Sequence, residues 1–189
     1  MLCIDPSFFL FIALLLLTLP PDWVAAAFYA SLIHELCHLT AVVLLRGKVR
    51  NIHIGIWGAR MDALLPDRKA ECLALLAGSA GSLVLMFLCR LFPRMALCGS
   101  IQGLYNLLPI RPLDGGRALL CVLEGSCPGN AERIMHLTEN IAVCLLLVAA
   151  VYGASVTSLG IFCLFPVLIP MAERIRRNTS CKQGRIGVQ

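Results

Sequence analysis

The sequence predicts an all-α polytopic membrane protein with about six transmembrane helices and a short β-hairpin at the membrane surface. Hydrophobic residues make up 59% of the 189 residues, charged residues make up only 14%, and the mean hydropathy is +0.83. A soluble domain usually has about 45–50% apolar and about 25% charged residues. This chain has too few charges to cover a water-facing surface, so a lipid bilayer is predicted to cover much of it.

The candidate spans follow one another along the chain, at residues 8–19, 23–45, 70–92, 95–123, 134–152 and 155–171. A spanning helix needs about 20 mostly apolar residues, and the first run is short by this measure. No basic residues precede it, so we expect a retained first span rather than a signal peptide. Prolines and polar residues interrupt the fourth run, and Gly153 and Ala154 predict a tight turn before the last one.

Residues 49–61 have a different pattern. Ile52, Ile54 and Ile56 alternate with other residue types, which is the period of two that is typical of a strand. We expect this segment to form a short hairpin or pair of strands at the membrane surface. No repeat or linker divides the chain, so residues 1–189 are predicted to form a single membrane-embedded domain.

The positive charge indicates how the chain is oriented. The net charge is +5, and basic residues cluster in two segments, residues 46–50 and 174–185. Basic clusters can bind nucleic acid, but both of these directly follow apolar runs, which is typical of cytoplasmic juxtamembrane segments. We therefore expect no nucleic acid partner and a multi-pass protein of the cell membrane. Six spans place both termini in the cytoplasm, and Arg90 and Arg94 then fall on the opposite side.

A metal-binding pattern lies inside the second apolar run. His34, Glu35 and His38 form an H-E-x-x-H motif, and side chains four apart on a helix share a face, so both imidazoles can bind one metal ion. Zinc suits three protein ligands plus one water, whose pKa it lowers toward about 7. Glu35 flanks the site and can accept a proton from that water. Ionisable groups inside a span are costly unless something binds them, which favours a metal site over a chance match.

The third ligand is less directly indicated. His53, His136 and several acidic residues are candidates, and Asp114 is favoured. Pro109 and Pro112 shortly precede Asp114, and prolines break a helix and remove backbone donors. Irregular backbone at membrane depth is tolerated only where it lines a cavity or is buried in protein. We therefore expect a broken segment that directs Asp114 inward, with an ordinary loop between spans as the alternative.

The motifs HELCH and NLLPIRPLDGG together resemble those of the site-2 protease family of intramembrane zinc metalloproteases. The second motif of that family is N-x-x-P-x-x-P-L-D-G-G, and this chain matches every fixed position. The resemblance implies one zinc ion bound by His34, His38 and Asp114, with Glu35 as the general base. It also implies that Asn106 helps to hold the substrate or to stabilise the oxyanion.

The same resemblance implies a three-helix catalytic core over about residues 23–123 and surface strands that hold an extended substrate. The expected partners are a membrane-associated protein substrate and regulators in the membrane. The chain is similar to the small bacterial members related to the stage IV sporulation protease, which cleaves a membrane-associated sigma-factor precursor. Ser79 and Ser82 stand where the family often has Pro and Asn.

Two other functions fit a metal site within a membrane. A metal transporter would need polar ligands on several spans, and only two apolar segments carry them here. A catalytically inactive metal-binding protein would not need Glu35, which is present. Hydrolysis of peptide bonds is therefore the predicted activity. The oligomeric state is not indicated by the sequence.

Overall fold

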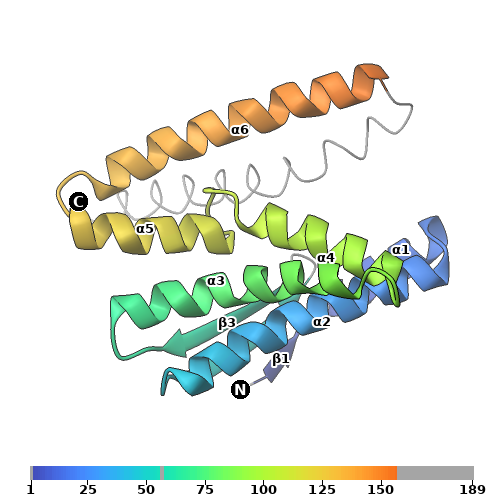
Figure 1. Cartoon of the computed structure of the whole chain (residues 1–189), viewed down its shortest axis with the longest axis horizontal. Coiled ribbons are helices and arrows are strands. Elements are labelled where there is room, and N and C mark those ends of the chain that lie inside the picture. Colours follow the sequence, from blue (N-terminus) through green and yellow to red (C-terminus); the bar gives the residue numbers. More distant parts are fainter. Residues whose placement is uncertain (1, 56–57, 157–189) are drawn as a thin grey trace, which may run out of the picture.

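The computed structural model describes residues 2–55 and 58–156. Within these residues the chain forms six α-helices, one short 3-10 helix and a three-stranded sheet. The helices α2, α3, α5 and α6 follow one another across the molecule (Figure 1). The prediction of a mainly helical chain with a small sheet is therefore confirmed.

The first two helices are α1 (Pro6–Thr18) and α2 (Pro21–Leu44). The Asp5 carboxylate caps α1 by accepting a hydrogen bond from the Ser7 backbone N–H, which lowers the pKa of Asp5. At about 1.5 Å per residue, α1 is roughly 20 Å long and does not match the thickness of a bilayer core of about 30 Å. A full first span therefore stays a prediction, whereas α2 is long enough to cross.

The sheet has the strand order β1-β2-β3, formed by β1 (Leu2–Ile4), β2 (Lys48–Gly55) and β3 (Gly58–Leu64). Strands β2 and β3 are antiparallel neighbours, so the hairpin predicted over residues 49–61 is confirmed. Its location at the membrane surface stays a prediction. Strand β1 joins β2 in parallel, and its three residues are too few to show a period in the sequence.

The third helix, α3 (Arg68–Val84), continues as the 3-10 helix η1 (Leu85–Leu88). The Asp67 carboxylate caps α3 by accepting a 2.7 Å hydrogen bond from the Ala70 backbone N–H. One face of α3 is buried and consists of small residues at four-residue intervals, namely Ala70, Ala74, Gly78 and Ser82. Small side chains let helices approach closely, and α3 lies against α2, α4 and α5.

The fourth apolar run forms two short helices, α4 (Pro93–Asn106) and α5 (Asp114–Ser126). Residues 107–113 separate them, as expected from the prolines, and the peptide bond between Arg111 and Pro112 is cis. Hydrogen bonds within the break are few, and one of them joins the Leu113 N–H to the Ile110 carbonyl at 2.9 Å. The predicted interruption of this run is confirmed.

The last described helix is α6 (Ala131–Val156). It passes through Gly153 and Ala154, so the predicted turn there is wrong. Glycine inside a helix costs only about 1 kcal/mol relative to alanine, and apolar residues continue on both sides. The candidate span at residues 155–171 lies almost entirely outside the described residues.

Three helical segments of the described chain are long and apolar enough to cross a membrane, namely Pro21–Leu44, Arg68–Leu88 and Ala131–Tyr152. Neither α4 nor α5 is long enough alone, so the count of about six spans stays a prediction. Leu137, Ile141, Leu145 and Val148 form a stripe along α6 and are all more than half exposed. An exposed apolar stripe of this kind suits contact with lipid.

The two ends of α2 differ in their charged neighbours. Arg46 follows its C-terminal end, where the residue adopts a positive φ of 58°. At the opposite end Arg94, from the start of α4, pairs with Asp22 and lies 5.7 Å from the centre of the Trp23 ring. Arg94 is therefore at the other end of the helix from Arg46, and the contacts with Asp22 and Trp23 engage its charge there.

Candidate metal centre

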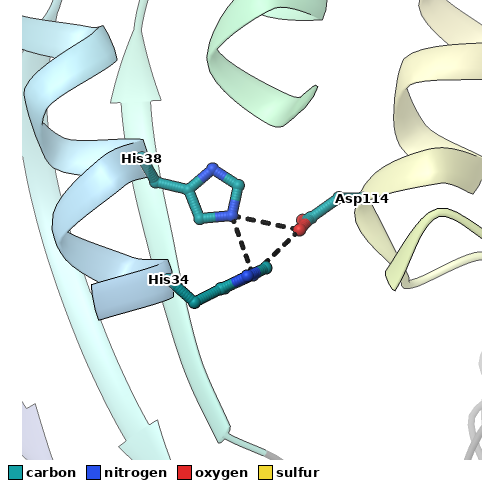
Figure 2. Close-up of side chains that lie close together, drawn as sticks. All are labelled: His34, His38 and Asp114. Atoms are coloured by element: carbon teal, nitrogen blue, oxygen red, sulfur yellow. Dashed lines mark hydrogen bonds and ion pairs between the residues drawn. The ribbon is translucent and has the colours of Figure 1, made fainter. Parts of the chain in front are cut away.

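His34 and His38 lie one turn apart on α2, and both point toward Asp114 at the start of α5, as Figure 2 shows. The Nε2 atoms of the two histidines are 3.2 Å apart. Asp114 Oδ2 lies 3.2 Å from His34 Nε2 and 3.0 Å from His38 Nε2. The structure thus brings together the three residues that the sequence predicts as ligands, although Asp114 lies 76 positions after His38 in the chain.

The two imidazoles are held by their other nitrogen atoms. His38 Nδ1 lies 2.7 Å from the Ala74 carbonyl oxygen, which can only accept a hydrogen bond. His38 Nδ1 therefore carries the hydrogen. His34 Nδ1 lies 2.9 Å from the Ser82 hydroxyl oxygen. The Asn106 amide nitrogen lies 3.3 Å from His34 Nε2, so the Asn106 side chain is also close to the candidate ligands.

In the tautomers with hydrogen on Nδ1, both Nε2 atoms face the Asp114 carboxylate oxygen as acceptors. Three lone-pair atoms within about the same small volume repel one another unless a cation lies between them. Zinc ligands lie about 2.0–2.1 Å from the ion, so tetrahedral ligands are roughly 3.3 Å apart. The separations of 3.0–3.2 Å are close to that value. The donor set and its spacing therefore fit a zinc ion.

Burial further separates this cluster from the other histidine candidates. The side chain of His34 is 3% exposed, that of His38 is 13% exposed and that of Asp114 is 15% exposed. His53 is an exposed residue of β2. His136 is an exposed residue of α6 beside Glu132 and Glu139. Neither His53 nor His136 joins the group of potential ligands that the described residues form.

The two predicted catalytic residues lie next to the cluster. Glu35 follows His34 on α2 and is half-buried, and Asn106 is the last residue of α4. Both line the same cavity as the three candidate ligands. Their roles in catalysis stay predictions, as do the metal-ligand roles of His34, His38 and Asp114.

The cavity has a volume of about 880 Å³ and reaches from the cluster to α1, α4 and β3. Most of its wall is apolar, including Phe11 and Leu15 from α1 and Met61 from β3. Among the described residues, β3 is an edge of the sheet, and an edge strand can pair with a further strand. The cavity is thus large enough for a short stretch of polypeptide, and an edge strand forms part of its wall.

Several residues that shape this site carry no recognisable signal in the sequence. Ser82 and the Ala74 carbonyl orient the two imidazoles, and both belong to α3. A Cβ atom at Gly78 would collide with the His38 imidazole, so the absence of a side chain there makes room for a candidate ligand. The run of small residues signalled close helix packing, but nothing in the sequence indicated which histidine each position would contact.

Comparisons with known proteins reveal a likeness to a solved structure. No family model and no curated protein matches the chain. Among solved structures, a site-2 protease from Methanocaldococcus jannaschii aligns with a TM-score of 0.62 and 23% sequence identity, over 91% of this chain and 89% of that chain.

The chain has the fold of a site-2 protease. The resemblance drawn from the two sequence motifs is thereby confirmed at the level of the fold. Within this site-2 protease fold, the cluster lies where α2 meets the start of α5, and the broken segment between α4 and α5 delivers Asp114 to it. An identity of 23% shows the fold alone. The activity is inferred from the geometry of the site.

Proposed function

We propose that this chain is an intramembrane zinc metalloprotease of the site-2 type, which hydrolyses peptide bonds of membrane-associated protein substrates. The observation that carries the proposal is the convergence of His34, His38 and Asp114 within 4.8 Å of one another beside a cavity that Glu35 also lines. Two helices supply these groups, and one of the two, α2, is apolar and long enough to cross a membrane.

The chemistry follows from the groups around the cavity. One zinc ion held by His34, His38 and Asp114 would supply a Lewis acid that polarises the scissile carbonyl and lowers the pKa of water toward about 7. Glu35 accepts the proton of the attacking water and later passes it to the leaving amine. The Asn106 amide donates a hydrogen bond to the substrate carbonyl, whose oxygen becomes negatively charged as water attacks.

The substrate has to reach this site as an extended chain. A peptide bond within a helix is shielded by its neighbours, so a helical substrate must unwind before hydrolysis. We propose that the unwound segment pairs with the free edge of β3 and occupies the cavity, because strand addition fixes a peptide through its backbone and leaves pockets to select side chains. A sporulation sigma-factor precursor is one candidate substrate.

The membrane setting belongs to the same proposal. We infer a multi-pass protein of the cell membrane with cytoplasmic termini, a single domain over residues 1–189 and a catalytic core over about residues 23–123. His34 lies ten residues before the end of α2, which places the site roughly 15 Å along the helix from that end at about 1.5 Å per residue. This depth is within a bilayer core of about 30 Å.

The decisive experiment compares the wild-type chain with the Glu35→Gln variant in the same host membrane. New N-termini in membrane proteins are counted by mass spectrometry. We expect cleavage products with the wild type and a loss of at least about 100-fold with the variant, since general base catalysis contributes about 10²–10⁴-fold. Zinc content should stay unchanged, because Glu35 is not among the candidate ligands.

Glu124→Gln is the matched control, because Glu124 is an exposed carboxylate of α5 that pairs with Arg68. It should cleave like the wild type. Undiminished cleavage by a stable Glu35→Gln variant would rule out the proposed mechanism.

A further inference from the structure

Glu139 is a buried carboxylate outside the three-helix core. It lies in α6, within a segment that is long and apolar enough to cross a membrane, yet the residue is only 5% exposed. An ionisable residue within a membrane-spanning helix is expensive and usually marks a functional contact. The proposed mechanism leaves Glu139 without a role.

Glu139 contacts Arg111, in the break between α4 and α5, and its Oε2 also lies 3.6 Å from His136 Nδ1 on its own helix. Glu139 Oε1 accepts hydrogen bonds from the Arg111 backbone N–H at 3.0 Å and from its Nε at 2.8 Å, and Glu139 Oε2 accepts one from Nη2 at 3.2 Å. The carboxylate therefore holds both the side chain and the backbone of one residue. Such a charged pair with several hydrogen bonds is directional as well as strong.

Arg111 stands three residues before Asp114, so fixing its backbone fixes the approach to α5. Pro109 and Pro112 lack backbone donors, so backbone hydrogen bonds within the break are limited to a few, such as that from the Leu113 N–H to the Ile110 carbonyl. Apolar packing acts at the same place: Ile110 and Leu113 are buried against Ala142. Ala142 lies three residues after Glu139 and thus on the same face of α6.

We propose that Glu139 is a positioning residue, which fixes the break through Arg111 so that Asp114 lies against His34 and His38. The inference rests on the proposed function in one respect, since it assigns Asp114 to the metal centre. It also adds α6 to the elements that shape the metal centre, because the Glu139 carboxylate that contacts the segment between α4 and α5 belongs to that helix.

A structural ion pair without any effect on the centre is the alternative, and α6 offers a control for it. Glu132 also contacts Arg111, through Nη1 at 3.1 Å, but its side chain is 61% exposed. Glu132→Gln therefore removes a negative charge from the same helix and the same guanidinium without touching the buried contacts. Glu139→Gln keeps one acceptor oxygen, and Glu139→Ala keeps none.

The test measures zinc affinity of the purified full-length chain by competition with a chromophoric chelator. Loss of a group that orients a metal ligand typically lowers affinity about 10–100-fold. We expect a loss in that range for Glu139→Ala and a smaller loss for Glu139→Gln. Glu132→Gln should stay within about twofold of the wild type, as exposed ion pairs contribute little.

Hydrogen exchange of residues 107–113, followed in the chain stripped of metal, provides a second readout. Both Glu139 variants should exchange faster there than the wild type and Glu132→Gln. Zinc affinity within about twofold of the wild type in a folded Glu139→Ala chain would overturn the proposal. If that variant does not fold, the same result for Glu139→Gln overturns it.

The two proposals can fail separately. Zinc binding that depends on Glu139 in a chain without protease activity would support the positioning role and contradict the proposed function. A wild-type chain that binds no zinc would contradict the proposed function, and hydrogen exchange of residues 107–113 would then decide whether Glu139 holds the break. Unchanged exchange in both Glu139 variants would overturn the positioning role.

Discussion

The ring orientations of His34 and His38 follow from single hydrogen bonds to α3. A carbonyl oxygen at Ala74 and a hydroxyl at Ser82 each engage an Nδ1 atom, which directs the Nε2 lone pairs toward Asp114. Histidine ligands in metal sites are commonly oriented in this way by a partner at the other ring nitrogen. The metal chemistry of α2 therefore depends on polar atoms of a neighbouring helix.

Replacement of Ser82 tests this dependence. Ser82→Ala removes the hydroxyl that lies 2.9 Å from His34 Nδ1, so the ring loses the contact that orients it. We expect zinc affinity to fall about 10–100-fold, measured by chelator competition. Ser100→Ala is the control, since Ser100 bonds the Ala96 carbonyl of its own helix. Equal affinity in both variants would contradict the assigned role of Ser82.

Helix α3 acts as a spacer as well as a source of hydrogen bonds. Its buried small face brings it against α2, and the His38 imidazole occupies the space that a side chain at Gly78 would fill. A longer side chain on this face would push the two helices apart or rotate His38 away from Asp114. The geometry of the cluster thus belongs to the contact between two elements and not to α2 alone.

Gly78→Ala is therefore expected to be harmful despite adding a single methyl group. Overpacking of a tight contact costs about 1–3 kcal/mol, and zinc affinity should fall with it. Gly125→Ala is the matched control, because Gly125 is also helical but a Cβ there meets nothing within 4 Å. That change should leave stability unchanged or raise it by about 0.4–1 kcal/mol. Thermal unfolding and zinc titration measure both, and similar stability of the two variants would contradict the spacer role.

The sequence revealed the elements of the site more fully than the contacts between them. The spacing of His34 and His38 and the prolines before Asp114 predicted a shared helix face and a broken segment, because both are local properties of the backbone. The pairing of Ser82 with His34 joins positions 48 apart, and that of Arg111 with Glu139 joins positions 28 apart. No local pattern indicates such contacts, since they depend on how the helices pack.

Element boundaries show the same limit. A tight turn was expected at Gly153 and Ala154, yet α6 continues to Val156. Strand β1 was not expected at all. Its conformation is decided by its pairing with β2 and not by a pattern in its own residues. Local sequence patterns therefore failed to predict an element where tertiary packing decided its conformation or where the element was too short to show a pattern.

The path of the chain through its helices predicts which loops lie on the same side of the membrane. From the end of α2, α3 and η1 cross to residues 89–92, and α4 with α5 return to residues 127–130. The basic residues after α2 place that end in the cytoplasm. The turn before α6 should therefore be cytoplasmic, and the turn before α4 should face the other side.

A protease recognition site inserted at each turn tests this arrangement. Gly129 is suited to one insertion, because a side chain there would meet nothing within 4 Å, and Arg90 is exposed and suits the other. We expect cleavage at 129 in inside-out vesicles only and at 90 in right-side-out vesicles only. Cleavage of both from the same side would contradict the proposed path of the chain.

The proposed activity depends most of all on a single metal centre assembled from α2 and α5. The most direct test is the zinc content of the purified full-length chain, measured by elemental analysis beside that of Asp114→Ala. We predict about one zinc per wild-type chain, as the single group of three candidate ligands in the described residues implies. The Asp114→Ala chain should lose most of its zinc when a chelator is added. A folded wild-type chain without zinc, or an Asp114→Ala chain that holds zinc as tightly as the wild type, would contradict it.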